Sequence, residues 1–170
     1  MKYLLDTNVC IIYLKGRNLN LKQRLEALPI QEIAVCSIVK AELCFGAMKS
    51  ANPERNFALQ QAFLAQFVSL PFDDLAATTF GAIRAQLETR GIPIGAYDLQ
   101  IAAIALANNL TLVTHNTREF GRIEGLQVED WEIEAKAIAS ATICDCSLFI
   151  KNAIAKMLEG SSQQMEAIAF

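Results

Sequence analysis

Short apolar runs alternate with helical segments along the first 131 residues of this 170-residue chain, and no other feature constrains the fold as strongly. The runs KYLL, IAVC, VSLPF, TLVT and GLQVEDW predict short strands. The segments between them carry apolar residues at helical spacing and end at glycine, proline or polar residues. Helices between successive strands imply an α/β fold, with a central, mostly parallel sheet and helices on both faces.

Three of the predicted helices begin at a polar residue. Ser37 follows the second strand and is expected to cap the helix that carries Glu42. Asp73 or Asp74 is expected to cap the helix after VSLPF. The helix DLQIAAIALANN is expected to begin at Asp98, after a loop rich in glycine and proline.

The pattern changes after Trp131, where the chain becomes alanine-rich and its periodicity weakens. We therefore expect one domain at 1–134 and a C-terminal extension at 135–170 that is helical or partly disordered. With 53% apolar and 19% charged residues, the composition is that of a compact globular protein.

Net charge, cysteine content and hydropathy limit the cellular compartments and the binding partners that fit this chain. The net charge of -3 leaves nucleic-acid binding to a local basic patch. The five cysteines form an odd set, and the N-terminus lacks the pattern of a signal peptide. Apolar runs are far shorter than the ~18 residues of a membrane span. These features predict a cytoplasmic protein with reduced thiols and no membrane association.

Acidic and amide side chains follow the predicted strands at the places where open parallel sheets bind ligands. Asp6 comes directly after the first strand, Glu42 lies six residues after the second, and Asn116 and Glu119 lie just beyond TLVT. Asp98 opens a helix and could either cap it or point into the same cleft. Each of these residues alone also fits a cap, a solvated helix surface or a surface ion pair.

Taken together, the same residues favour a metal site. A hard divalent cation needs several oxygen ligands close together, and it neutralises carboxylates that would otherwise repel one another. No cysteine or histidine belongs to this set, which favours Mg²⁺ or Mn²⁺ over Zn²⁺. The number of ions is left open.

Four segments carry a resemblance to a known family: LLDTNVCI, SIVKAELCFGA, GIPIGAYDLQIAAIA and VTHNTREFGRIEGLQVEDW. They resemble the PIN-domain ribonucleases, specifically the VapC-like toxins of bacterial toxin-antitoxin pairs, over residues 1 to about 132. The resemblance implies a PIN-like three-layer α/β/α sandwich. It also implies a magnesium-dependent endoribonuclease, with Mn²⁺ as an alternative ion, that acts on structured RNA such as tRNA. A homodimer and a neutralising cognate antitoxin are implied as partners.

The resemblance also suggests roles for individual residues. Asp6 and Asp98 match the two metal-binding aspartates, and Glu42 matches the helix glutamate, so these three are the expected catalytic residues. Thr7 and Asn8 match the residues that support the first aspartate.

The fourth acidic position departs from the family pattern. Many PIN domains have aspartate after the last-but-one strand, whereas this chain has Asn116 there, with Glu119 three residues on. An asparagine amide oxygen can still hold a metal-bound water, so a site with three carboxylates remains workable. Either residue could complete the site.

Other candidates are weaker. His115, the only histidine, is more often packed or solvated at such a position than catalytic. RNA phosphates could be held by basic residues that equally well serve solubility: Lys15, Arg17, Lys40, Lys49, Arg84, Arg90 and Arg118. The rival to the enzyme is a non-catalytic PIN-like module that binds RNA or protein. The presence of Asp6, Glu42 and Asp98 favours the enzyme.

Overall fold

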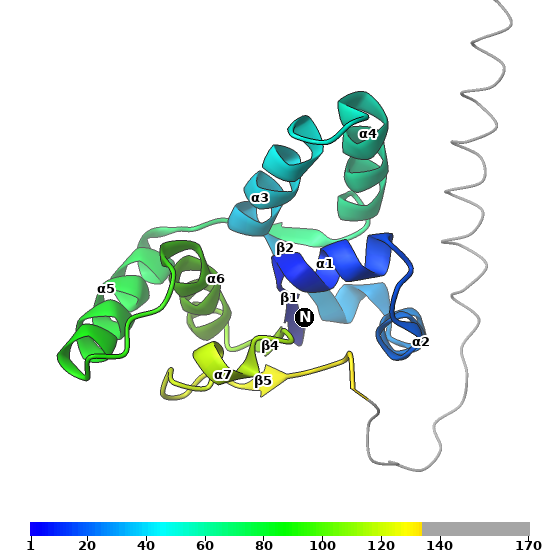
Figure 1. The fold of residues 1–170 in the computed structure, drawn as a ribbon. Coiled ribbons are helices and arrows are strands. Elements are labelled where there is room, and N and C mark those ends of the chain that lie inside the picture. Colours follow the sequence, from blue (N-terminus) through cyan, green and yellow to red (C-terminus); the bar gives the residue numbers. More distant parts are fainter. Residues whose placement is uncertain (134–170) are drawn as a thin grey trace, which may run out of the picture.

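Five parallel strands form the centre of the protein in a computed structural model that describes residues 1–133 (Figure 1). The strands are β1 (Tyr3–Leu5), β2 (Ile33–Cys36), β3 (Val68–Leu70), β4 (Thr111–Val113) and β5 (Val128–Glu129). Their order in the sheet is β3-β2-β1-β4-β5, and every neighbouring pair is parallel. The predicted parallel sheet is confirmed, with each strand inside a run that the sequence analysis assigned.

The strand order reverses at β1, because β2 and β3 extend the sheet to one side and β4 and β5 extend it to the other. In open α/β sheets such a reversal opens a crevice at the carboxyl ends of the strands, between β1 and β4 in this case. Residues that directly follow β1 and β4 are therefore placed at the binding crevice.

Helices connect the strands and cover the sheet. They are α1 (Thr7–Leu14), α2 (Leu19–Ala27), α3 (Ser37–Met48), α4 (Pro53–Leu64), α5 (Asp74–Thr89), α6 (Ala96–Ala107) and α7 (Thr117–Phe120), with a 3₁₀ turn η1 (Ile30–Glu32) before β2. In Figure 1, α1 and α2 lie on one side of the strands and α5 and α6 on the other. The helices α3 and α4 pack together as a pair, as do α5 and α6.

The helix starts confirm one expected cap and correct two. Asp73 caps α5, with a carboxylate oxygen that accepts a hydrogen bond from the Ala76 N–H at 2.9 Å. Ser37 is the first residue of α3 rather than its cap, since Cys36 has extended backbone angles and no capping side chain. Helix α6 begins at Ala96 after Gly95. The expectation that Asp98 starts this helix is therefore wrong by two residues, and its carboxylate is not used as a cap.

Burial explains why the strands are almost wholly apolar. Parallel strands with helices on both faces have no solvated side, so their side chains alternate between two buried layers. All residues of β1 and β2 are buried. Helix α6 contributes a buried run at 101–105, which makes it the most enclosed helix of the sandwich.

Trp131 closes the core beyond the last strand. Its side chain is 1% exposed and packs edge-on against Tyr3 with 4.9 Å between ring centroids. The indole N–H donates to the Glu129 carboxylate at 2.8 Å, and the Arg24 guanidinium lies 5.0 Å from the ring centroid. Residues after β5 therefore belong to the folded domain at least as far as Trp131.

Within residues 1–133, no helix combines the length and apolar character that crossing a membrane requires. The expected C-terminal extension, 135–170, lies outside the described residues, and the boundary at Glu134 stays a prediction.

Two truncations test that boundary. A chain that stops after Glu134 keeps Trp131, so we expect it to unfold at the same midpoint as the full chain. A chain that stops after Asp130 loses the indole, and we expect it to lose about 3–5 kcal/mol of unfolding free energy, the usual cost of deleting a large buried aromatic side chain. Circular dichroism during urea unfolding measures both. Insolubility of the longer truncation would show that residues beyond 134 cover core surface.

Candidate metal centre

Asp6 stands at the point where the strand order reverses. It follows β1 in an extended conformation and caps α1, with Oδ1 accepting from the Thr7 N–H at 2.7 Å. Its Oδ2 accepts from the Thr114 hydroxyl at 2.9 Å, directly after the neighbouring strand β4. The residue is 3% exposed. The structure thus gives Asp6 both roles that the sequence left open, because it caps a helix and also lies in the crevice.

The pKa of Asp6 is raised, and burial is the main cause. The hydrogen bonds from Thr114 and Thr7 oppose this rise, while the charges of Glu42 and Glu132 add to it. The carboxylate is therefore well satisfied by hydrogen bonds but lies in a field of like charge. Such a field favours a bound cation.

Thr114 belongs to the candidate centre, and the sequence analysis did not identify it. It is fully buried, and its hydroxyl donates to Asp6 while accepting from the Asn116 N–H at 3.0 Å. One hydroxyl thus orients Asp6 and fixes the turn after β4. The sequence shows a threonine at the end of a predicted strand. Its contact with Asp6 can be predicted only when β1 and β4 are known to be neighbours in the sheet.

Glu42 reaches the same centre from α3. It is the sixth residue of that helix, and its Oε2 accepts from the Thr7 hydroxyl at 2.5 Å. Thr7 therefore supports two acids, because its N–H binds Asp6 and its hydroxyl binds Glu42. Asn8, the other residue expected to support Asp6, is exposed and has no side-chain hydrogen bond within residues 1–133.

Asp98 lies in the first turn of α6 and is half-buried. Its pKa is raised to about 6, by burial first and then by the charges of Asp6, Glu119 and Glu42. An electrostatic influence on one carboxyl group from three others shows that the chain gathers all four acids in one region. They come from four separate segments of the sequence.

Asn116 and Glu119 are linked to one another. The Asn116 side-chain N–H donates to the Glu119 carboxylate at 3.0 Å. Asn116 immediately precedes α7, and its amide oxygen has no hydrogen-bond partner within the described residues. Asn116 thus keeps an oxygen available as a ligand, while Glu119 contributes the negative charge.

The donor set fits a hard divalent cation. Asp6, Glu42, Asp98 and Glu119 offer carboxylate oxygens, Asn116 offers an amide oxygen, and no sulfur or imidazole belongs to the set. The ligand atoms of Asp6, Glu42 and Asp98 do not all lie within 4.8 Å of one another. Among residues 1–133, only His115, Asp130 and Glu132 form a group of acidic, histidine or cysteine side chains that meets this limit.

The expected phosphate-binding cations divide into two groups. Within residues 1–133, Arg84 pairs with Glu88, and Arg90 pairs with Glu124. In the same part of the chain, no ion pair engages the other five candidates: Lys15, Arg17, Lys40, Lys49 and Arg118. Lys40 lies two residues before Glu42, and Arg118 lies between Asn116 and Glu119, so these two cations flank the acids in sequence.

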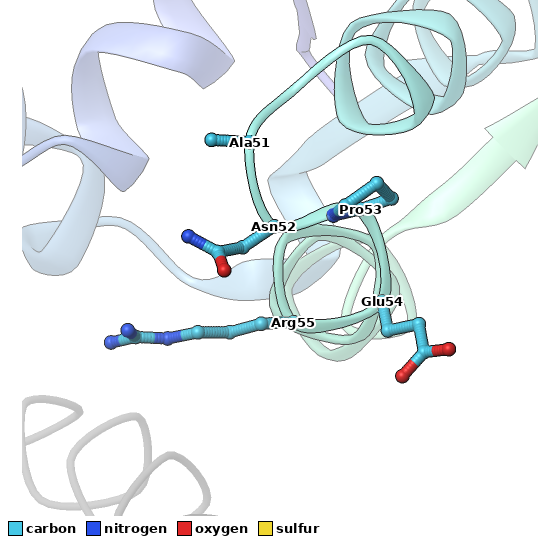
Figure 2. A pocket seen from close by; sticks show the side chains of 5 residues that line it. All are labelled: Ala51, Asn52, Pro53, Glu54 and Arg55. Atoms are coloured by element: carbon cyan, nitrogen blue, oxygen red, sulfur yellow. The ribbon is translucent and has the colours of Figure 1, made fainter.

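A hollow elsewhere on the surface has no part in this centre. It measures about 350 Å³ and lies at the turn between α3 and α4, where residues 51–55 line it (Figure 2). The side chains of Glu54 and Arg55 point to opposite sides of the helix end there. None of the clustered acids contributes to its wall.

Comparison with known proteins agrees with this geometry. The model of the PIN domain family matches residues 3–126. The chain is 41% identical to the tRNA(fMet)-specific endonuclease VapC of Shigella flexneri, over 77% of this chain and 98% of that protein. It is equally similar, over the same shares, to ribonuclease VapC2 of Haemophilus influenzae strain Rd.

A solved structure shows the same architecture. The DNA-bound VapBC of Salmonella typhimurium superposes with a TM-score of 0.74 at 41% identity, over 77% of this chain and 98% of the matched chain. The parallel sheet, the helices around it and the sequence identity all lead to one classification: the chain belongs to the PIN domain family and, within it, to the VapC ribonucleases.

Proposed function

We propose that this protein is a magnesium-dependent endoribonuclease that hydrolyses phosphodiester bonds in structured RNA, with Mn²⁺ able to replace Mg²⁺. The observation that carries the proposal is the grouping of acids at the carboxyl ends of the strands. Thr7 binds both Asp6 and Glu42, and the charges of Asp6, Glu119 and Glu42 raise the pKa of Asp98. Four acids that repel one another are costly to maintain, and a catalytic cation is the physical reason to maintain them.

The residues of the chain divide the work among themselves. Asp6 and Glu42 are held by Thr7, and Asp6 also by Thr114, so two ligands are oriented before any ion arrives. Asp98 and either Asn116 or Glu119 would complete the site. A bound Mg²⁺ would lower the pKa of a water molecule and stabilise charge on the phosphate. Lys40 and Arg118 are available to hold neighbouring phosphates of the RNA.

The substrate proposal rests on the relatives. The VapC of Shigella flexneri is named as specific for tRNA(fMet), so tRNA is the first structured RNA to test. The rival is a PIN-like module that binds RNA or protein without cleaving it. The presence of the acids and of the hydrogen bonds that orient Asp6 and Glu42 supports the enzyme, because a binding module has no need for clustered, partly buried charge.

A cognate antitoxin and a second copy of the chain are the proposed protein partners. The solved relative from Salmonella typhimurium is a VapBC complex, which supports an antitoxin of the VapB kind. Apolar side chains on the α3–α4 pair support a protein contact: Phe45 is 64% exposed and Met48 is 53% exposed. An extended antitoxin segment could place a basic side chain beside Asp6 and Asp98 and so block the centre.

The acids provide the direct test of the nuclease. Asp6→Asn and Asp98→Asn should each lower cleavage of total tRNA by more than about 100-fold, because each removes a charged ligand of the ion. Asp74→Asn is the matched control, since Asp74 is an exposed acid in the first turn of α5. Cleavage over a magnesium titration is the measurement. Full activity in either ligand variant would exclude this metal centre and, with it, the nuclease.

Stability without metal should depend on pH through Asp98. Its pKa rises from 3.8 to about 6 on folding, so between these values the folded chain holds a proton that the unfolded chain has lost. Stability therefore falls as pH rises through this window, and Asp98→Asn escapes the loss. In EDTA, we expect the variant to melt above the parent at pH 7 and close to it near pH 4. A difference that does not change with pH would contradict the assignment of the charge cluster.

Asn116→Asp separates the two candidates for the remaining ligand. The substitution adds a carboxylate and removes the donor to Glu119, so we expect lower stability in EDTA. In the presence of Mg²⁺, half-maximal cleavage should need roughly tenfold less ion, because added ligand charge tightens binding. An unchanged magnesium requirement would assign the position to Glu119, and Glu119→Gln is the matching variant.

Growth tests the toxin and its partner. Expression of the parent alone should arrest growth, whereas expression of Asp6→Asn should not. Co-expression with the antitoxin encoded beside the gene should restore growth and yield a complex that co-purifies. Normal growth with a parent protein that cleaves RNA in vitro would contradict the toxin while leaving the enzyme intact.

A further inference from the structure

A second cluster of ligand atoms lies at the exits of β4 and β5. His115 follows Thr114 at the end of β4, and Asp130 follows Glu129 at the end of β5. The two strands are parallel neighbours, so both residues emerge at the same edge of the sheet. His115 Nδ1 lies 2.9 Å from Asp130 Oδ2. Ligand atoms of His115, Asp130 and Glu132 all lie within 4.8 Å of one another.

The backbone around Asp130 brings Glu132 to the other two side chains. Asp130 Oδ1 accepts from the Glu132 N–H at 2.9 Å, which folds the chain back after β5. Asp130 thereby uses one oxygen to hold this turn and the other to face His115. The Asp130 side chain is 11% exposed and the His115 side chain is 62% exposed, so a well-buried acid fixes one end of a cluster that opens to solvent at the imidazole.

Glu132 supplies an independent observation. Its Oε1 atom is buried and has no hydrogen-bond partner within the described part of the chain. A buried carboxylate oxygen without a partner costs free energy, and in folded proteins such atoms are nearly always satisfied. The contact between His115 and Asp130 accounts for those two side chains but leaves the Glu132 Oε1 atom unexplained. A cation held by all three side chains would satisfy it.

The chemistry of the donors sets the kind of ion. One imidazole nitrogen and two carboxylates form a mixed set of ligands, unlike the oxygen-only set around Asp6. Imidazole favours zinc and other first-row transition ions over Mg²⁺. Three protein ligands also leave a coordination position for water or for a further group.

We propose that His115, Asp130 and Glu132 form a second metal site, which binds a first-row transition ion such as Zn²⁺ and is separate from the centre at Asp6, Glu42 and Asp98. The site joins the exit of β4 to the segment that follows Trp131. It also neutralises Glu132, whose charge acts on Asp6, so a filled second site reduces the repulsion at the first. The proposal rests on its own contacts and does not depend on RNA cleavage.

The chain contains one histidine, which makes the test direct. The full 170-residue protein, freed of any histidine tag, is titrated with zinc chloride in saturating Mg²⁺ while the imidazole proton resonances of His115 are followed by NMR. We expect these resonances to shift and to saturate at one zinc per chain, whereas Mg²⁺ alone leaves them in place. Asp130→Asn and Glu132→Gln should each weaken zinc binding by about tenfold or more.

Asp98→Asn is the matched control, because it removes an acid of the other centre and should leave the zinc titration unchanged. Circular dichroism establishes that each variant is folded. Resonances that stay unchanged at millimolar zinc would overturn the proposal. It would also be overturned if the Asp130→Asn and Glu132→Gln variants bound zinc as the parent does, because His115 would then bind zinc alone. Loss of zinc binding in Asp98→Asn would overturn the separation of the two sites.

Discussion

The hydrogen bond between Thr114 and Asp6 is the contact on which the arrangement of the site depends. It crosses from the end of β4 to the end of β1, where the strand order of the sheet reverses. It gives a buried carboxylate a second partner besides the Thr7 N–H, and burial without partners would cost several kcal/mol. Because Thr114 also fixes the Asn116 backbone, one side chain aligns the first acid with the turn that presents the fourth position.

Satisfied hydrogen bonds do not remove the repulsion among the acids. The pKa of Asp6 and that of Asp98 are both raised, and in each case burial comes first and neighbouring carboxylates follow. A structural cluster would be relieved by basic partners, yet no lysine or arginine forms an ion pair with these two aspartates within residues 1–133. The domain therefore carries a local energetic cost that a divalent cation would remove. Functional sites commonly store strain in this way.

The sequence was sufficient for the strands, because buried parallel strands are nearly all apolar and their short runs stand out between helices. It was sufficient to place Asp6 and Glu42 at the carboxyl end of the sheet, because both follow strands closely, while their role as metal ligands stays a prediction. It misplaced the start of α6, since Gly95 and Ala96 begin the helix before Asp98 and no capping side chain marks the place. The contacts of Thr114 and those of the group at His115, Asp130 and Glu132 form only because particular strands are neighbours. The order of strands in a sheet cannot be predicted from local sequence.

Asn116 illustrates how one residue of the proposed metal centre can affect the protein differently with and without a bound ion. An aspartate there would add a fifth carboxylate to Asp6, Glu42, Asp98 and Glu119. Its ionised side chain could not donate a hydrogen bond to Glu119 and would repel it. Asparagine instead donates to Glu119 at 3.0 Å, and within residues 1–133 its amide oxygen has no hydrogen-bond partner. The asparagine replaces a repulsion with a hydrogen bond in the metal-free protein, and in a metal-bound protein it would leave the ion with one charged ligand fewer. A departure from the family pattern that looks like erosion of the site is thus consistent with a working centre that binds its ion less tightly and folds more readily without it.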